Sequence, residues 1–228
     1  TSVFYYTFVL NYYHSLKNNK EMADLIDIIK GSLSEDVLGQ LGQQVGISDK
    51  KKTSDATEGA IGILLNAIQK KGGDSNAAGS FASALDRDHD GSILDDVMGY
   101  LSGSSNLPAK TTNGEGILGH LLGNKQKSTI DMLGKKAGLD SQSAGNLLAK
   151  LAPIVLGALG KQKSTGGLDA GGILDMLTGS IQKQQSGGNA MGSLLDIFLQ
   201  GQSGQKSSGK GQLLNMGMKI LGSLFKKK

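Results

Sequence analysis

Glycine divides this chain into short apolar stretches whose spacing fits helices. The sequence holds 35 glycines in 228 residues, about double the usual share of roughly 7%. Between them, apolar residues recur at helical intervals, as in Val37, Leu38, Leu41 and Val45, which fall on one helix face. No convincing alternation of apolar and polar residues, the mark of a strand, follows Met22. The sequence therefore predicts an all-α, multihelical protein whose helices end at glycines.

One helix–Gly turn–helix pattern occurs twice. Residues 41–48 (LGQQVGIS) parallel residues 133–140 (LGKKAGLD), and a longer apolar stretch follows each, at 64–68 and at 155–159. Ser48 and Asp140 are placed to cap the second helix of each copy. The copies predict two related helical units, residues 22–105 and 106–180.

A shorter amphipathic unit of about two helical turns also recurs. Residues 93–99, 117–123 and 173–179 each end at a glycine, and a fourth copy begins at residue 194. No helix of this length is stable alone in water, so each copy needs a larger core, another copy or a partner. Linkers rich in Gly, Ser, Gln and Lys are predicted at 102–114, 161–172, 182–189 and 201–211. Residues 181–228 are thus expected to be a flexible Gly-rich region with short amphipathic helices.

The first 21 residues differ in composition from the rest. Residues 1–21 hold six of the ten aromatic residues, and the following Met22-Ala23-Asp24-Leu25 reads like a natural start. Our hypothesis is that residues 1–21 are non-native upstream translation or a disordered leader. The alternative is a signal peptide or anchor, although the apolar run 3–10 lacks a basic region before it and a small-residue cleavage site after it.

Composition excludes several classes of function. The chain has no cysteine, which excludes disulfides, thiolate chemistry and Cys-based zinc sites; we expect a cytoplasmic protein. Arg87 is the single arginine among 24 basic residues, and the net charge is +4. Because arginine is the residue best suited to reading phosphates and bases, sequence-specific nucleic-acid binding is not expected. The longest apolar-rich run, 147–159, suits a buried helix and falls short of the ~20 residues that span a membrane.

An acidic loop carries the sharpest chemical signal. Asp86, Asp88, Asp90 and Ser92, with an intervening glycine, resemble the start of an EF-hand calcium loop. Val97 stands at the twelfth position, where a bidentate glutamate belongs. The pattern predicts a weak calcium site over residues 86–97. The alternative is an acidic turn in which Asp90 or Ser92 caps the following helix.

Two basic segments offer binding hypotheses. Lys50, Lys51 and Lys52 would open the second helix of a corner with helix-turn-helix spacing, and could meet phosphates. The alternative is a packing corner, because the matching helix of the other copy is too apolar to lie in a DNA groove. Residues 213–228 combine an apolar face with a lysine tail, which predicts peripheral contact with an anionic membrane surface. A helix docked on the protein itself is the alternative there.

Catalysis finds no support in the sequence. The three histidines, His14, His89 and His120, form no pair with metal-ligand spacing, and no serine-nucleophile or phosphate-loop motif occurs. His120, among leucines, is expected to be structural. We therefore expect no enzyme and no cofactor apart from a weakly bound calcium ion. The preferred function is a non-enzymatic interaction or scaffolding module that binds a protein partner or self-associates.

Several motifs together resemble a known family. The opening at Met22, the Leu-Gly-x-x-x-Gly-apolar-Ser/Asp turn and residues 151–157 (LAPIVLG) resemble the bacterial domain of unknown function 937 (YidB-like) family. The resemblance extends roughly from Met22 to Gly179. It implies a small multihelical fold in a bacterial protein of unknown function, and it implies no activity, since none is recorded in the family's name.

Overall fold

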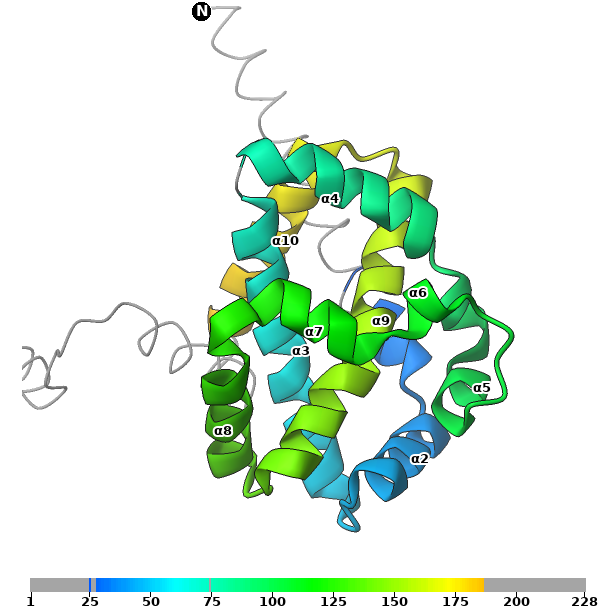
Figure 1. Ribbon diagram of the computed structural model, residues 1–228, viewed down its shortest axis with the longest axis vertical. Helices are drawn as coiled ribbons and strands as arrows, with labels where there is room; N and C mark the ends of the chain where they lie inside the picture. Colours follow the sequence, from blue (N-terminus) through cyan, green and yellow to red (C-terminus); the bar gives the residue numbers. More distant parts are fainter. Residues whose placement is uncertain (1–24, 26–27, 74, 187–228) are drawn as a thin grey trace, which may run out of the picture. The chain divides into compact units, whose positions relative to one another are not determined.

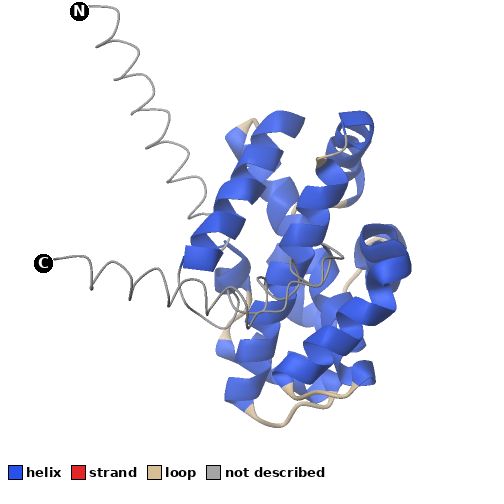
Figure 2. Cartoon of the chain, turned by 90° about the vertical axis from the view of Figure 1, so that its left-hand side faces the viewer, coloured by secondary structure: helices blue, strands red, loops and turns tan. Residues whose placement is uncertain are grey.

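The computed structural model describes residue 25, residues 28–73 and residues 75–186 (Figure 1). All regular structure in these residues is helical, without a strand, which confirms the all-α class (Figure 2). The described helices belong to one compact unit. In chain order they are residues 28–32, α2 (Glu35–Val45), α3 (Lys50–Gly72), α4 (Ser75–Asp88), the 3-10 helix η1 (Ser92–Asp96), α5 (Val97–Ser102), α6 (Ala109–Thr112), α7 (Gly114–Leu122), the 3-10 helix η2 (Gly123–Lys125), α8 (Gln126–Ala137), α9 (Ser141–Gly166) and α10 (Ala170–Ser186).

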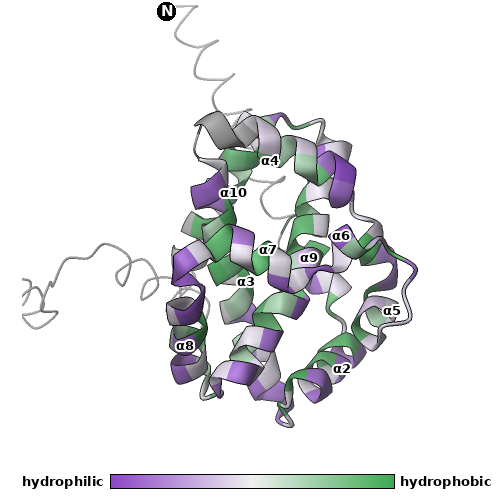
Figure 3. Cartoon of the chain, viewed as in Figure 1, coloured by the Kyte–Doolittle hydropathy of each residue, from purple (hydrophilic) through white to green (hydrophobic). Residues whose placement is uncertain are grey.

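Two long helices, α3 and α9, pack against each other at the centre and carry most of the core. Every residue from 59 to 68 in α3 and from 151 to 160 in α9 is buried. Figure 3 shows this as apolar colouring along both helices. By length and composition α9 could cross a membrane, but 78% of its most apolar 18-residue window is buried inside the protein. Its apolar sequence is therefore accounted for by its place in the core.

The predicted linker at 161–172 is largely helical. Helix α9 continues to Gly166, and α10 begins at Ala170 and runs past the predicted end of the second unit to Ser186. Tertiary contacts hold the last turns of α9 in place, because Gln162 is buried and Lys163 pairs with Asp86 of α4. The local composition of this segment, rich in lysine and glycine, gave no sign of these contacts.

Pro153 lies inside α9 and shapes the contact with α7. A proline has no N–H, so the carbonyl of Ala149, four residues earlier, loses its helical donor. Gly114, the first residue of α7, approaches that same carbonyl so closely that a Cβ built on it would lie 1.8 Å from Ala149 O. Only a residue without a side chain fits there, and the sequence supplies a glycine at the required position.

The two corners α2–α3 and α8–α9 are built in the same way. Gly46 and Gly138 end the first helix of each corner in the left-handed conformation, with φ of 77° and 64°. In the second corner Asp140 caps α9 as predicted, its side chain accepting a hydrogen bond from Ser143 N. In the first corner the predicted N-cap, Ser48, was wrong. This corner is one residue longer, and Asp49 caps α3 instead.

The corners also pack reciprocally. Helix α2 lies on α9 while α8 lies on α3, and likewise α4 lies on α9 while α10 lies on α3. A Cβ on Gly46 would meet Ser143 Oγ at 3.6 Å, and one on Gly138 would meet Lys52 Cε at 3.6 Å. Ser143 and Lys52 are both third residues of their helices. Residues on either side of the predicted boundary at 105/106 thus share one core, and the division into two units stays a prediction.

Candidate functional site

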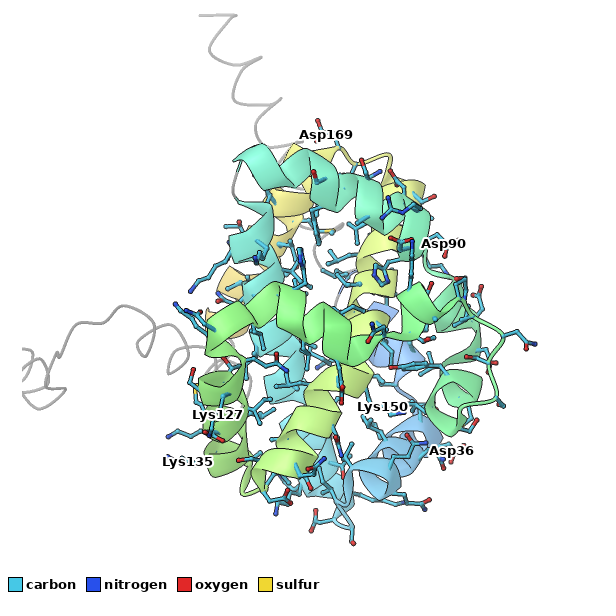
Figure 4. The ribbon with its side chains drawn as sticks, viewed as in Figure 1. Asp36, Asp90, Lys127, Lys135, Lys150 and Asp169 are labelled. Atoms are coloured by element: carbon cyan, nitrogen blue, oxygen red, sulfur yellow. The ribbon has the colours of Figure 1, made fainter. Side chains whose placement is uncertain are left out.

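The acidic loop between α4 and η1 does not gather its carboxylates. Asp86 forms an ion pair with Lys163 of α9 at 2.5 Å, and Asp88 pairs with the neighbouring Arg87 at 2.6 Å. Asp90, labelled in Figure 4, accepts a hydrogen bond from Ser92 N at the start of η1. In residues 25, 28–73 and 75–186 no group of three or more His, Asp or Glu side chains is arranged to hold a metal ion. The calcium site stays a prediction without support from this geometry.

The hydrogen bonds to these carboxylates favour their charged forms. The Arg87 guanidinium lowers the pKa of Asp88, chiefly through its hydrogen bonds. The amide of Ser92 lowers the pKa of Asp90 in the same way. Each acid therefore has its own stabilising partner. The Asp90–Ser92 bond closes an Asx turn, whereas the N-cap position of η1 is Gly91, which makes no side-chain capping bond, so a helix cap by Asp90 or Ser92 stays a prediction.

The loop takes its shape from packing against two glycines of α9. A Cβ on Gly160 would lie 1.6 Å from His89 O, and one on Gly157 would lie 2.4 Å from Ile93 Cγ2. Gly91 has φ +102° and lies against Lys161 of the same helix. The glycine that suggested an EF-hand turn is thus required by a left-handed backbone and by close approach to α9.

This packing buries His89. It is 7% exposed, and its Nδ1 has no hydrogen-bond partner within the described residues. Burial lowers the pKa of His89, against the opposing influence of Asp88 and Asp90. A neutral imidazole with an unused buried nitrogen costs free energy unless another group supplies a hydrogen-bond partner.

His89 lines a groove with a volume of about 670 Å³ between α4 and α7, hereafter the α4–α7 groove. Its apolar floor combines residues from α4, α7 and α9, namely Phe81, Leu85, Ile117, Leu121 and Leu156. Its charged and polar lining comes from the end of α3, from α4 and from the α6–α7 region, namely Lys71, Ser80, Arg87, Asp88, Lys110, Asn113 and His120. The groove therefore joins an apolar surface to a basic edge.

The basic edge carries more cationic side chains than carboxylates. Arg87 is paired with Asp88, whereas Lys71 and Lys110 form no ion pair with any residue that the structure describes. His120, expected to be structural, is instead exposed at the groove. Such an arrangement can bind an anionic group beside an apolar one.

Lys50, Lys51 and Lys52 lie in the first turn of α3 and have separate surroundings. Lys51 pairs with Asp55 one turn later, which raises the pKa of Lys51. Lys52 packs near Gly138 of the opposite corner. Because α3 is buried from residue 59 to residue 68, it does not have the free face of a recognition helix. Nucleic-acid contact stays a prediction, and the burial favours the packing-corner alternative.

Sequence reasoning missed the α4–α7 groove because no local motif marks it. Its lining residues are spread from Lys71 to Leu156 and come together through the packing of α4 and α7 on α9. Lys110 and Ile117 lie in a segment (AKTTNGEGIL, residues 109–118) that carries no recognisable binding motif. The predicted membrane-contact segment 213–228, the leader 1–21 and the linkers beyond residue 186 lie outside the described residues.

Comparison with known proteins gives one match. A family model for bacterial proteins of unknown function (DUF937) matches residues 27–162, more than half of the chain. Searches of curated proteins and of solved structures gave no significant match. All residues that line the α4–α7 groove lie within the matched range.

Proposed function

We propose a non-enzymatic interaction role for this chain, which belongs to the family of bacterial proteins of unknown function DUF937. The module self-associates through the region after Gly187, and the packed helices before it serve as a rigid body. This role would suit a scaffolding protein, whose function is to hold copies of itself or partners together.

The proposal rests on how the short amphipathic units bury their apolar side chains. The copies that begin at Ile93, Ile117 and Ile173 each lie on a central helix, the first two on α9 and the third on α3. Each buries its main apolar side chains there: Ile93 and Val97 in the first, Leu118 and Leu121 in the second, and Ile173 and Leu177 in the third.

The fourth copy, which begins at Leu194, has the same apolar pattern and lies outside the described residues. Two helical turns are not stable alone in water, so this copy also requires an apolar surface. We propose that a second copy of the chain supplies this surface.

Size-exclusion chromatography with light scattering tests this role. The full chain should have a larger mass than a monomer, and a chain that ends at Gly187 should be monomeric. Leu195→Glu should shift the full chain toward monomer, because it places a charge on the apolar face. Gln200→Glu adds the same charge at a polar position and should leave the mass unchanged. A monomeric full chain, or equal effects of both substitutions, would contradict the proposal.

A further inference from the structure

We propose that the α4–α7 groove binds an anionic amphiphile, a small molecule with one unbranched apolar chain and a carboxylate head. This site is independent of the proposed self-association, because it lies wholly within the described helices before Gly187. The inference rests on the floor of the groove, on its charge and on the unpartnered nitrogen of His89.

The floor of the groove fits an apolar chain. Phe81 of α4 and Ile117 of α7 are half-buried at the surface of the groove, and Leu156 of α9 is buried beneath them. The volume of about 670 Å³ lies within the roughly 300–1,000 Å³ typical of small-molecule sites. A chain of methylene groups would gain free energy by covering these side chains, in proportion to the apolar area removed from water.

The edge of the groove fits an anionic head. Lys71, Arg87 and Lys110 come from three different elements and line the groove, and its single lining carboxylate, Asp88, pairs with Arg87 and is also attracted by Lys110. Three cations and one carboxylate leave a net charge of +2 on the described lining, which favours an anionic head. His89, which also lines the groove, has a buried Nδ1 without a partner among the described residues; in the tautomer that carries its proton there, Nδ1 can donate to a carboxylate or to a water molecule.

Charge also decides against the chain's own basic tail as the occupant. The amphipathic segment 213–228 carries Lys219 and the terminal lysines Lys226, Lys227 and Lys228, and no acidic residue. Like charges at Lys71 and Lys110 would repel it. A small ligand with a single negative head matches both the sign of the edge and the apolar floor.

Titration calorimetry on the full chain, with three probes that separate head from chain, tests the site. Dodecanoate, below its micelle-forming concentration, should bind with one site per chain. Dodecyltrimethylammonium, with the same chain and a positive head, and acetate, with the head alone, should each bind at least about tenfold more weakly. Equal binding of the two dodecyl compounds would overturn the proposal, and so would an acidic amphipathic peptide that binds where dodecanoate does not.

Matched variants locate the site. The double variant Lys71→Glu/Lys110→Glu should weaken dodecanoate binding about tenfold and strengthen the binding of dodecyltrimethylammonium, since an exposed ion pair is worth up to about a fivefold change in affinity. Lys136→Glu, at an exposed lysine of α8 outside the groove, should change neither. A loss of equal size in Lys136→Glu would overturn the proposal.

Chemical-shift mapping provides a test that needs no variant. In the wild-type chain, dodecanoate should move the amide signals of Phe81, His89 and Ile117 together, because these residues line one groove. Shifts confined to residues outside the groove would overturn the assignment of the site even if calorimetry detected binding.

Discussion

Gly160 should be a position where alanine, normally favoured in helices, is destabilising. Replacing a glycine by alanine inside a helix usually stabilises a protein by about 0.4–1 kcal/mol. At Gly160, however, the new Cβ would lie 1.6 Å from His89 O, whereas real contacts of this kind are not shorter than 3.0 Å. The loop at His89 must therefore move away from α9 by about 1.4 Å.

That movement disturbs closely packed residues of the core. His89 is buried, and Ile93, four residues later, is completely buried against the same helix. Forcing extra volume into such packing typically costs about 1–3 kcal/mol. Since this exceeds the helical gain, we expect Gly160→Ala to lower the free energy of unfolding by about 2 kcal/mol. The melting temperature should fall by about 4–8 °C for a chain of this size.

Gly39→Ala is the matched control. Gly39 also lies inside a helix, α2, but a Cβ built there meets no atom within 4 Å. It should raise the free energy of unfolding by about 0.5–1 kcal/mol. Urea unfolding followed by circular dichroism measures both variants. Stabilisation by Gly160→Ala would refute the reasoning, because the loop would then not rest on α9 at this glycine.

Three further predictions follow from other contacts. Gly114→Ala should destabilise the protein by about 1–3 kcal/mol in urea unfolding, because its Cβ would meet the Ala149 carbonyl; a stability equal to wild type would contradict the close approach of α7. Hydrogen bonds from Ser143 lower the pKa of Asp140 in the folded protein. The charged Asp140 carboxylate therefore stabilises the fold above its unfolded pKa near 3.9, and this stabilisation is lost as the pH falls through the folded pKa. Asp140→Asn should keep the cap and remove this part of the pH dependence in melting curves measured from pH 6 down to pH 2, and an unchanged profile would count against it. Calcium titrated by calorimetry should give no site-specific heat with wild type or Asp88→Ala, since the loop carboxylates have separate partners; heat lost in the variant would restore the EF-hand hypothesis.

Local features of the fold could be predicted from the sequence, because their causes lie within a few residues. Gly46 and Gly138 end helices, and Asp140 caps one, through hydrogen bonds that span three to five residues. The prediction that Ser48 caps the second helix was wrong for an equally local reason, since Asp49, one position later, takes the N-cap position of α3. Helix class and most helix ends therefore follow from periodicity, glycine and capping.

Tertiary placement could not be predicted in this way. The carboxylates of the acidic loop have the spacing of a calcium site, but Lys163, far along the chain, pairs with Asp86, and Gly160 of α9 fixes the loop. Lys71 and Ile117 are also far apart in sequence, and both line one groove. Such contacts depend on how α4 and α7 cross α9, which periodicity does not specify.

The reciprocal packing of the corners means that neither half of the chain is self-sufficient. A fragment ending at residue 105 would leave the leucines and isoleucines of α3 uncovered on the side where α8, α9 and α10 now lie. Since the fragment's own α2 and α4 have the form to cover a helix like α9, two such fragments could cover each other.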